Sequence, residues 1–266
     1  MARLGTVAID STRVKGSASP DRLLRRDKLE RELRRKVERW QRELDDDPDR
    51  DPGTRVGEQQ IAHLREPLKC LRESGEEKLS TTDPEARFLR ERGRFVLGYT
   101  AEIAVSEDHF LVAQRVTQNK SDNGSLVPMV EEVERQCGQR PERVLADCGF
   151  FSNQNLREMQ ARGIEAYVPD PNLARELNTG ERARGVGRMT VSNPHLKRSR
   201  KRLRSRRGRA CDKKRKAMVE PVIGILKEQR GMRQFYRRGK AATAAEWALA
   251  AMAYNLIRYR NLRRAG

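Results

Sequence analysis

The sequence predicts an α/β domain in which helices pack against a mixed β-sheet. Two short apolar runs, residues 6–9 and 144–146, each lead directly into an aspartate. Residues 95–105 and 110–117 have the composition of two strands joined by a tight turn. From residue 123 onward, helix-like and strand-like stretches alternate, which is typical of strands that are connected through helices.

The order of these elements narrows the fold further. Helices are expected over 123–137 and 152–162, and a further strand over 164–169. An antiparallel three-stranded start followed by helix-linked parallel strands is the order of a ribonuclease-H-like domain. We assign its first strands to segment 1–20, its continuation to segment 79–169 and its C-terminal helices to segment 213–266.

Segment 21–78 is predicted to be an insertion into that domain. Apolar residues recur every three or four positions along two otherwise charged stretches, which predicts two helices with narrow apolar seams. Residues 45–53, rich in Asp and Pro, are expected to form the loop between them. The result is an antiparallel helical hairpin that serves as a spacer or a dimer contact. The first seam is Leu29, Leu33, Val37, Trp40 and Leu44, and the second is Ile61, Leu64, Leu68 and Leu71.

Segment 170–212 is polar, rich in Gly and Arg, and without periodicity, so we expect it to be extended or disordered. Between residues 197 and 216 there are 13 Lys or Arg against one acid, Asp212. Such a run is typical of a solvated phosphate-binding arm. A localisation-type basic tract, which needs no fold, is the alternative.

The charge of the chain points to a polyanionic partner. Its 266 residues carry a formal net charge of +19, and its sequence pI is about 10.4. A surplus of this size favours nucleic acid, because each phosphate contact releases counterions. Surface charge that only keeps the protein soluble is the alternative explanation.

The four cysteines are widely spaced, with no Cys-x-x-Cys pair, which argues against structural zinc and against a disulfide framework. The sequence has no signal peptide and no long apolar stretch. We therefore expect a soluble protein of the reducing cytoplasm.

Asp147 stands where a buried strand is expected to end. Gly149 allows the chain to turn at once, and Ser152 or Asn153 is placed to cap the next helix. Active sites of open α/β sheets commonly lie at such strand ends. Asp10 repeats the pattern after residues 6–9. The alternatives are a turn cap for Asp147 and a hairpin-turn residue for Asp10.

A third acid, Glu220, lies in a strongly basic neighbourhood. A helix is expected from about Lys213 to Gln229, with its buried side at positions 219, 222, 223 and 226. Glu220 and Lys227 share another face of that helix. Because Pro221 is tolerated only near a helix start or at a kink, Glu220 should lie in the first turn or at a bend.

Three acids that converge in a cationic protein repel one another unless a cation lies between them. Hard oxygen ligands suit Mg²⁺. Two such ions would serve in-line phosphoryl transfer.

The chain resembles the DDE-type transposases of bacterial insertion sequences, over about residues 5 to 262. The first family signature stands here as Asp10-Ser11-Thr12-Arg13, and the second as residues 146–150, Ala-Asp-Cys-Gly-Phe. Glu220 and Lys227 fit the second half of the third signature. Similar too are the lead-in Asp83-Pro84-Glu85-Ala86-Arg87, the strand at Gly98-Tyr99, and the tail from Glu246-Trp247-Ala248 to Asn255-Leu256.

The chain departs from the family pattern at several positions. Ser11 replaces a glycine and Phe150 a tyrosine, while Lys213 and Lys216 occupy the usual tyrosine and arginine positions. Lys216 keeps the charge but loses the planar fork for phosphate. The family's N-terminal DNA-recognition region is missing ahead of Asp10, so we expect an N-terminally truncated catalytic domain.

The resemblance implies metal-dependent DNA cleavage and strand transfer of an insertion sequence. It implies that Asp10, Asp147 and Glu220 are the catalytic residues and hold two Mg²⁺ ions, with Mn²⁺ as a substitute. The partners would be element-end and target DNA, with a homodimer in the synaptic complex. The alternatives are an inactive truncated remnant that binds DNA non-specifically and a ribonuclease-H-like nuclease of another lineage. The expected DNA-binding residues are Lys227, Arg13, Lys216, Arg230, Arg233, Arg237 and Arg238.

Overall fold

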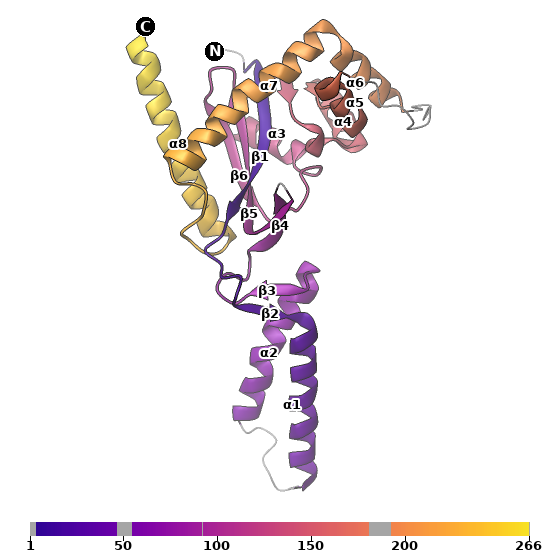
Figure 1. Cartoon of the computed structure of the whole chain (residues 1–266), viewed down its shortest axis with the longest axis vertical. Helices are drawn as coiled ribbons and strands as arrows, with labels where there is room; N and C mark the ends of the chain where they lie inside the picture. The colour runs from indigo at the N-terminus through magenta and orange to yellow at the C-terminus, as the bar shows by residue number, and fades with distance from the viewer. Residues whose placement is uncertain (1–3, 47–54, 92, 181–192, 266) are drawn as a thin grey trace.

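The computed structural model describes residues 4–46, 55–91, 93–180 and 193–265. These residues form an α/β body and a pair of helices that projects from it (Figure 1). The body is a mixed sheet flanked by helices, which is consistent with the predicted ribonuclease-H-like fold.

The sheet has the antiparallel start and the helix-linked parallel strands that the order of elements predicts. The central strand β1 (Thr6–Lys15) pairs antiparallel with β5 (Arg94–Ser106) and parallel with β7 (Arg143–Leu145). On the outer sides, β6 (Leu111–Thr117) pairs antiparallel with β5, and β8 (Glu165–Tyr167) pairs parallel with β7. The order is therefore β6-β5-β1-β7-β8.

Strand β1 is buried on both faces of the sheet, as expected for a central strand. Ile9 belongs to the apolar cluster that contains helix α3 (Leu126–Cys137). Ala8 and Val14 belong to the cluster on the opposite face. The alternation of side chains along a strand explains how neighbouring residues serve the two clusters.

Asp10 lies in the middle of β1, so the prediction that its strand ends there is wrong. The chain does not turn at Ser11, because β5 is long enough to pair with β1 as far as Lys15. The far end of this pairing depends on Gly98, where a Cβ would lie 2.1 Å from the Val14 carbonyl oxygen. A further strand that the sequence pattern did not reveal, β4 (Arg87–Glu91), pairs antiparallel with the start of β5.

Helices α1 (Arg26–Asp46) and α2 (Arg55–Ser74) lie side by side in the projection (Figure 1). Leu29 of α1 packs in one apolar cluster with Leu64, Leu68 and Leu71 of α2. Strands β2 (Leu23–Arg25) and β3 (Lys78–Ser80) pair antiparallel at the base, so the chain enters and leaves the projection at adjacent points. The predicted loop from residue 47 onward and the side chains of Trp40 and Leu44 lie outside the described residues.

The prediction that segment 170–212 is extended or disordered is wrong for the residues that the structure describes there. They form α5 (Pro171–Thr179), α6 (Pro194–Arg204) and the start of α7 (Arg206–Gly224). Each helix begins with a side-chain cap, from Asp170, Asn193 and Ser205 respectively. Caps and distant ion pairs therefore order a segment that lacks apolar periodicity. Residues 181–192 lie outside the described part.

Helix α7 begins earlier than the sequence suggests. It starts at Arg206, passes through Pro221, and continues into a π-helical turn at Ile225–Gln229. Glu220 therefore lies well inside the helix, and its predicted place in the first turn is wrong. The extra turns come from the basic stretch that carries no apolar pattern of its own.

The remaining predicted helices are present. Helix α4 (Asn153–Ala161) is capped by Ser152, and α8 (Lys240–Ala265) closes the body. Several of the residues that carry the family resemblance form hydrogen bonds that hold elements of the body together. Asp83 accepts a hydrogen bond from the Tyr99 hydroxyl at 2.8 Å, and the Asn255 amide bonds both backbone groups of Leu111. None of the described helices is long and apolar enough to cross a membrane.

Candidate active site

The parallel pairing of β1 with β7 places Asp10 next to Asp147. Ala8 lies opposite Leu145 in this register, and both residues are fully buried. Two residues further along each chain, the same register brings the two aspartates side by side. Buried apolar residues thus set the register, and the register sets the carboxylate pair.

Asp147 follows β7 closely, as predicted, and it also caps the turn at Cys148–Phe150. Its Oδ1 accepts a hydrogen bond from the Gly149 backbone N–H at 2.8 Å. A Cβ at position 149 would lie 3.0 Å from the same oxygen, so glycine keeps the turn close to the carboxylate. The cap involves Oδ1, which leaves Asp147 able to serve as a ligand through its other oxygen.

The environment of Asp10 disfavours its charged form. Burial, followed by the charge of Asp147, raises the pKa of Asp10 from 3.8 to about 6. The backbone N–H of Ser11, 2.8 Å from Oδ1, and the nearby Arg215 act in the opposite direction without cancelling the rise. The positive charge beside the pair therefore does not balance its negative charge, a condition that a bound cation would relieve.

Arg215 is the cation that faces this pair in the structure. Its Nη1 lies 3.4 Å from Asp10 Oδ2, and its side chain is only 11% exposed. It shares the buried side of α7 with Met218, Val219 and Val222. The spacing of three, four and seven residues to those positions is the signal that could have revealed it. The family resemblance pointed instead to Lys213 and Lys216.

A fourth charged residue, Asp122, lies beside the pair and was missed. Its charge contributes to the raised pKa of Asp10, and its Oδ2 would lie 3.3 Å from a Cβ at position 149. Arg13 holds it, with Nη1 3.1 Å from Asp122 Oδ1 and 3.1 Å from the Ser11 hydroxyl. Asp122 stands in a polar loop before α3, where its pattern is that of an ordinary turn residue.

Glu220 is not part of this cluster in the structure. Its side chain is exposed, and it has no hydrogen bond or ion pair with the described residues. Five residues along a helix correspond to a rotation of about 140°, so Glu220 and Arg215 project from different sides of α7. No group of three or more His, Cys, Asp or Glu side chains within the described ranges is placed to hold a metal ion.

The basic residues expected to contact DNA divide into paired and unpaired groups. Lys227 donates to the Arg13 carbonyl at 2.9 Å and lies 3.2 Å from a Glu91 oxygen. Arg233 pairs with Glu228, as Arg13 does with Asp122. Exposed and without an ion pair to the described residues are Lys216, Arg230, Arg237 and Arg238.

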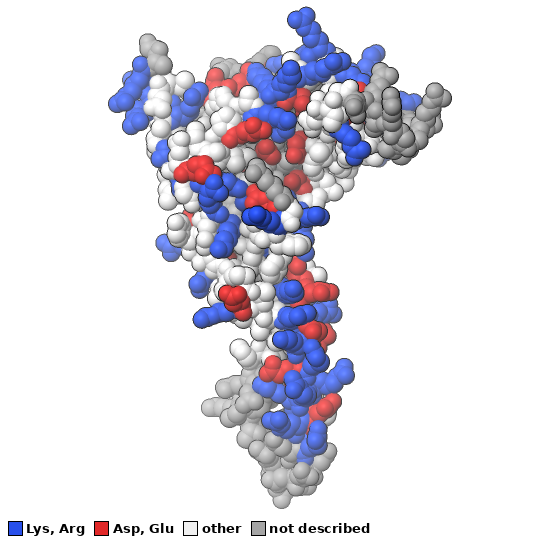
Figure 2. Space-filling model, in the orientation of Figure 1, with Lys and Arg blue, Asp and Glu red and all other residues white. Residues whose placement is uncertain are grey.

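Charge is distributed unevenly over the molecule. On the face shown in Figure 2, acidic side chains gather over the middle of the body, while Lys and Arg side chains lie along its upper edge. Along the projecting helices the two signs alternate (Figure 2). An acidic centre beside basic surfaces suits a site that holds cations and a polyanion together.

Comparison with known proteins agrees with this picture at the level of the family. The model of the transposase DDE domain matches residues 5–256. Comparisons with curated proteins and with solved structures gave no match. Because the match extends over most of the sequence, the chain belongs to the transposase DDE domain family, whose members catalyse phosphoryl transfer on DNA during transposition and generally use divalent metal ions.

Proposed function

We propose that this chain is the catalytic unit of an insertion-sequence transposase. It cleaves DNA at the element end and joins the freed 3′-hydroxyl to target DNA. The observation that carries the proposal is the pairing of Asp10 with Asp147 on adjacent parallel strands, in surroundings that raise the pKa of Asp10 to about 6. A carboxyl whose pKa is raised by burial and by a neighbouring charge, as that of Asp10 is, is typical of functional sites.

The donor chemistry of this pair fits a divalent cation. Two carboxylates offer hard oxygen ligands and an unbalanced negative charge, which Mg²⁺ or Mn²⁺ would neutralise. Asp10, Asp147 and Glu220 are the proposed ligands of two Mg²⁺ ions. When bound, the ions supply activation of the attacking oxygen and stabilisation of the leaving oxygen.

The protein's own residues account for the remaining steps. Arg215 balances part of the charge on Asp10, and it has to move or share that position when a cation binds, because it lies 3.4 Å from Oδ2. Glu220 projects from another side of α7 than Arg215, so it would join the set through a turn or shift of α7. Lys227 lies near the end of β1 and would hold a backbone phosphate.

The wider organisation follows the same proposal. Segments 1–20, 79–169 and 213–266 form the catalytic domain, and segment 21–78 is an insertion. Element ends and target DNA are the proposed partners, with a homodimer in the synaptic complex. The basic residues Lys216, Arg230, Arg233, Arg237 and Arg238 add non-specific affinity that falls as salt rises.

A second candidate is an inactive remnant that binds DNA but does not cut it. The observation that favours it is the exposed position of Glu220, together with Arg215 at the place where a cation would bind. Under this alternative the fold and the charge persist after the catalytic set has ceased to assemble.

A strand-transfer assay separates the two. The full chain is incubated with DNA that carries the inverted repeats found next to its gene, in Mg²⁺ and in Mn²⁺. Cleavage that disappears in Asp147→Asn, and equally in Glu220→Gln, supports the three-carboxylate proposal. Binding without cleavage in either metal favours the remnant, and cleavage unchanged in Asp147→Asn refutes the proposed site.

A further inference from the structure

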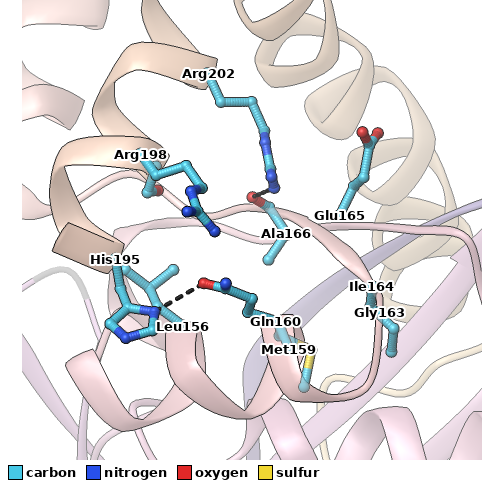
Figure 3. Close-up of a pocket in the computed structure, with 11 residues that line it drawn as sticks. Leu156, Met159, Gln160, Gly163, Ile164, Glu165, Ala166, His195, Arg198 and Arg202 are labelled. Atoms are coloured by element: carbon cyan, nitrogen blue, oxygen red, sulfur yellow. Dashed lines mark hydrogen bonds between the residues drawn. The ribbon is translucent and has the colours of Figure 1, made fainter.

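A pocket lies at the outer edge of the sheet, where α6 packs against α4 and β8 (Figure 3). Its volume is about 210 Å³. The wall from α6 carries three side chains that can donate hydrogen bonds, His195, Arg198 and Arg202, and also the buried Ser199. None of these residues belongs to the carboxylate pair, and the sequence pattern assigned this stretch to a disordered arm.

The cations of the pocket retain unused donors. Arg198 is exposed, has no ion pair with the described residues, and extends into the pocket (Figure 3). Arg202 donates through Nη1 to the Ala166 carbonyl at 3.3 Å and lies over the Tyr167 ring at 5.7 Å. A guanidinium has five N–H donors, so most of those on both arginines remain available.

Polar neighbours surround these cations. The His195 Nδ1 lies 2.8 Å from the Gln160 Oε1 and shares a hydrogen bond with it (Figure 3). The one carboxylate in the lining, that of Glu165, is 3.2 Å from Arg207 and turns away from Arg198. The pocket therefore carries net positive charge, with its acid already paired.

Other arginines on α6 do have ion-pair partners, so the lack of a partner for Arg198 among the described residues is not a general feature of the helix. Arg200 binds Asp170 through two hydrogen bonds of 2.8 Å each. Arg204 binds Glu176 at 2.8 Å. These two residues hold α6 against α5, whereas Arg198 holds nothing among the described residues, so its guanidinium is free for an external anion.

We propose that this pocket binds a phosphate of the duplex DNA backbone. The planar fork of Arg198 matches two phosphate oxygens, and a Lys in its place would not. This proposal rests on the proposed function, because that function makes DNA the polyanion that the protein binds.

The position suits DNA that also reaches the carboxylate pair. Glu165 lies opposite Arg143, which is four residues before Asp147, a distance of about 13 Å along the strand direction. DNA carries one phosphate per about 3.4 Å of its axis on each strand, so a duplex that runs along the strands would cover this separation with about four nucleotides.

The experiment measures binding alone. The full chain and its variants are titrated in EDTA against a labelled DNA duplex at several salt concentrations, by fluorescence anisotropy. Arg198→Gln should weaken binding several-fold and lower the log-log salt slope by about 0.9. Arg198→Lys should keep the slope and lose part of the affinity. Lys197→Gln, one residue away and outside the pocket, should weaken binding less than Arg198→Gln.

Two outcomes would overturn the proposal that this pocket binds a DNA phosphate. One is Lys197→Gln weakening binding as much as Arg198→Gln, which would mean diffuse surface charge. The other is an unchanged slope in a folded Arg198→Gln. Failure of the pocket is distinct from failure of the proposed function, because only the latter would leave the wild-type chain unable to bind any duplex.

Arg200→Gln serves as the control for an arginine with a structural role. It should lower the melting temperature and leave the salt slope unchanged.

Discussion

Asp10 and Asp170 are carboxylates of the same body that the fold treats in opposite ways. Burial alone would raise the pKa of Asp170, but the hydrogen bonds and charge of Arg200, with two backbone N–H groups, outweigh it and lower that pKa. Burial and the charge of Asp147 raise the pKa of Asp10, and its one ion pair among the described residues, with Arg215, is 3.4 Å long.

The contrast separates structural acids from reactive ones. A carboxylate such as Asp170, whose two oxygens both accept hydrogen bonds from an arginine, has its charge balanced and fixes the helices that hold it. Two adjacent carboxylates, of which Asp10 has one arginine at 3.4 Å, leave free energy to be recovered when a cation binds. The second condition identifies Asp10 and Asp147 as the candidate ligands, and the first removes Asp170 from consideration.

The largest expected effect is on catalysis. Asp147→Asn keeps an oxygen that can accept from the Gly149 N–H, so a residue that only caps the turn would tolerate it. A ligand would not, and we expect strand transfer to fall by more than about 1,000-fold, or about 4 kcal/mol of transition-state stabilisation. The exposed Asp108→Asn is the control and should retain activity. Equal activity in both variants would contradict the ligand role.

The next effect is on stability. Asp170→Ala removes the cap of α5 and leaves Arg200 without its partner. We expect the free energy of unfolding to fall by about 3 kcal/mol. Chemical denaturation measures it, with the exposed Asp108→Asn again as the control. A loss of unfolding free energy no larger than that of the control would show that Asp170 does not have the structural role that sets it apart from Asp10.

Metal binding should depend on the Asp10–Asp147 pair and not on exposed acids elsewhere. At a Mg²⁺ concentration 100 times the dissociation constant, the folded state gains about 2.7 kcal/mol. The melting temperature of the unchanged chain and of the exposed control Glu131→Gln should therefore rise on adding Mg²⁺ and return on adding EDTA. Asp147→Asn should show little rise. A similar rise in this variant would place the metal elsewhere.

The smallest effect is a pH dependence measured without metal. The folded state holds the Asp10 proton more tightly than the unfolded state, with a pKa of about 6 against 3.8. The stability that this proton contributes is present at low pH and is lost as pH rises through 6. Asp10→Asn mimics the protonated form, so it should gain about 1 kcal/mol over the unchanged chain at pH 8.

At pH 3 most of that advantage should be gone, because the Asp10 carboxyl is then largely protonated in the folded and in the unfolded chain. Denaturant titrations at the two pH values in EDTA give the comparison. A variant that is less stable than the unchanged chain at pH 8 would mean that Arg215, deprived of its partner, dominates the balance.

Much of the fold could be predicted because local signals are strong in the body. The apolar runs before Asp10 and Asp147, the alternation over 95–105 and the helical spacing over 123–137 all correspond to observed elements. The basic stretch was misjudged because its helices begin at side-chain caps and are held by ion pairs such as Arg200 with Asp170. Such pairs join residues that no local window contains.

The sequence by itself determined the α/β class, the identity of the two paired aspartates and the basic character of the chain, since each depends on local pattern and composition. Only the tertiary structure decided what surrounds those aspartates. Arg215 reaches Asp10 across 205 positions of the chain, and Arg13 reaches Asp122 across 109. Electrostatic interactions act through space, so the partners of Asp10 became visible only once β1, β7 and α7 were packed together.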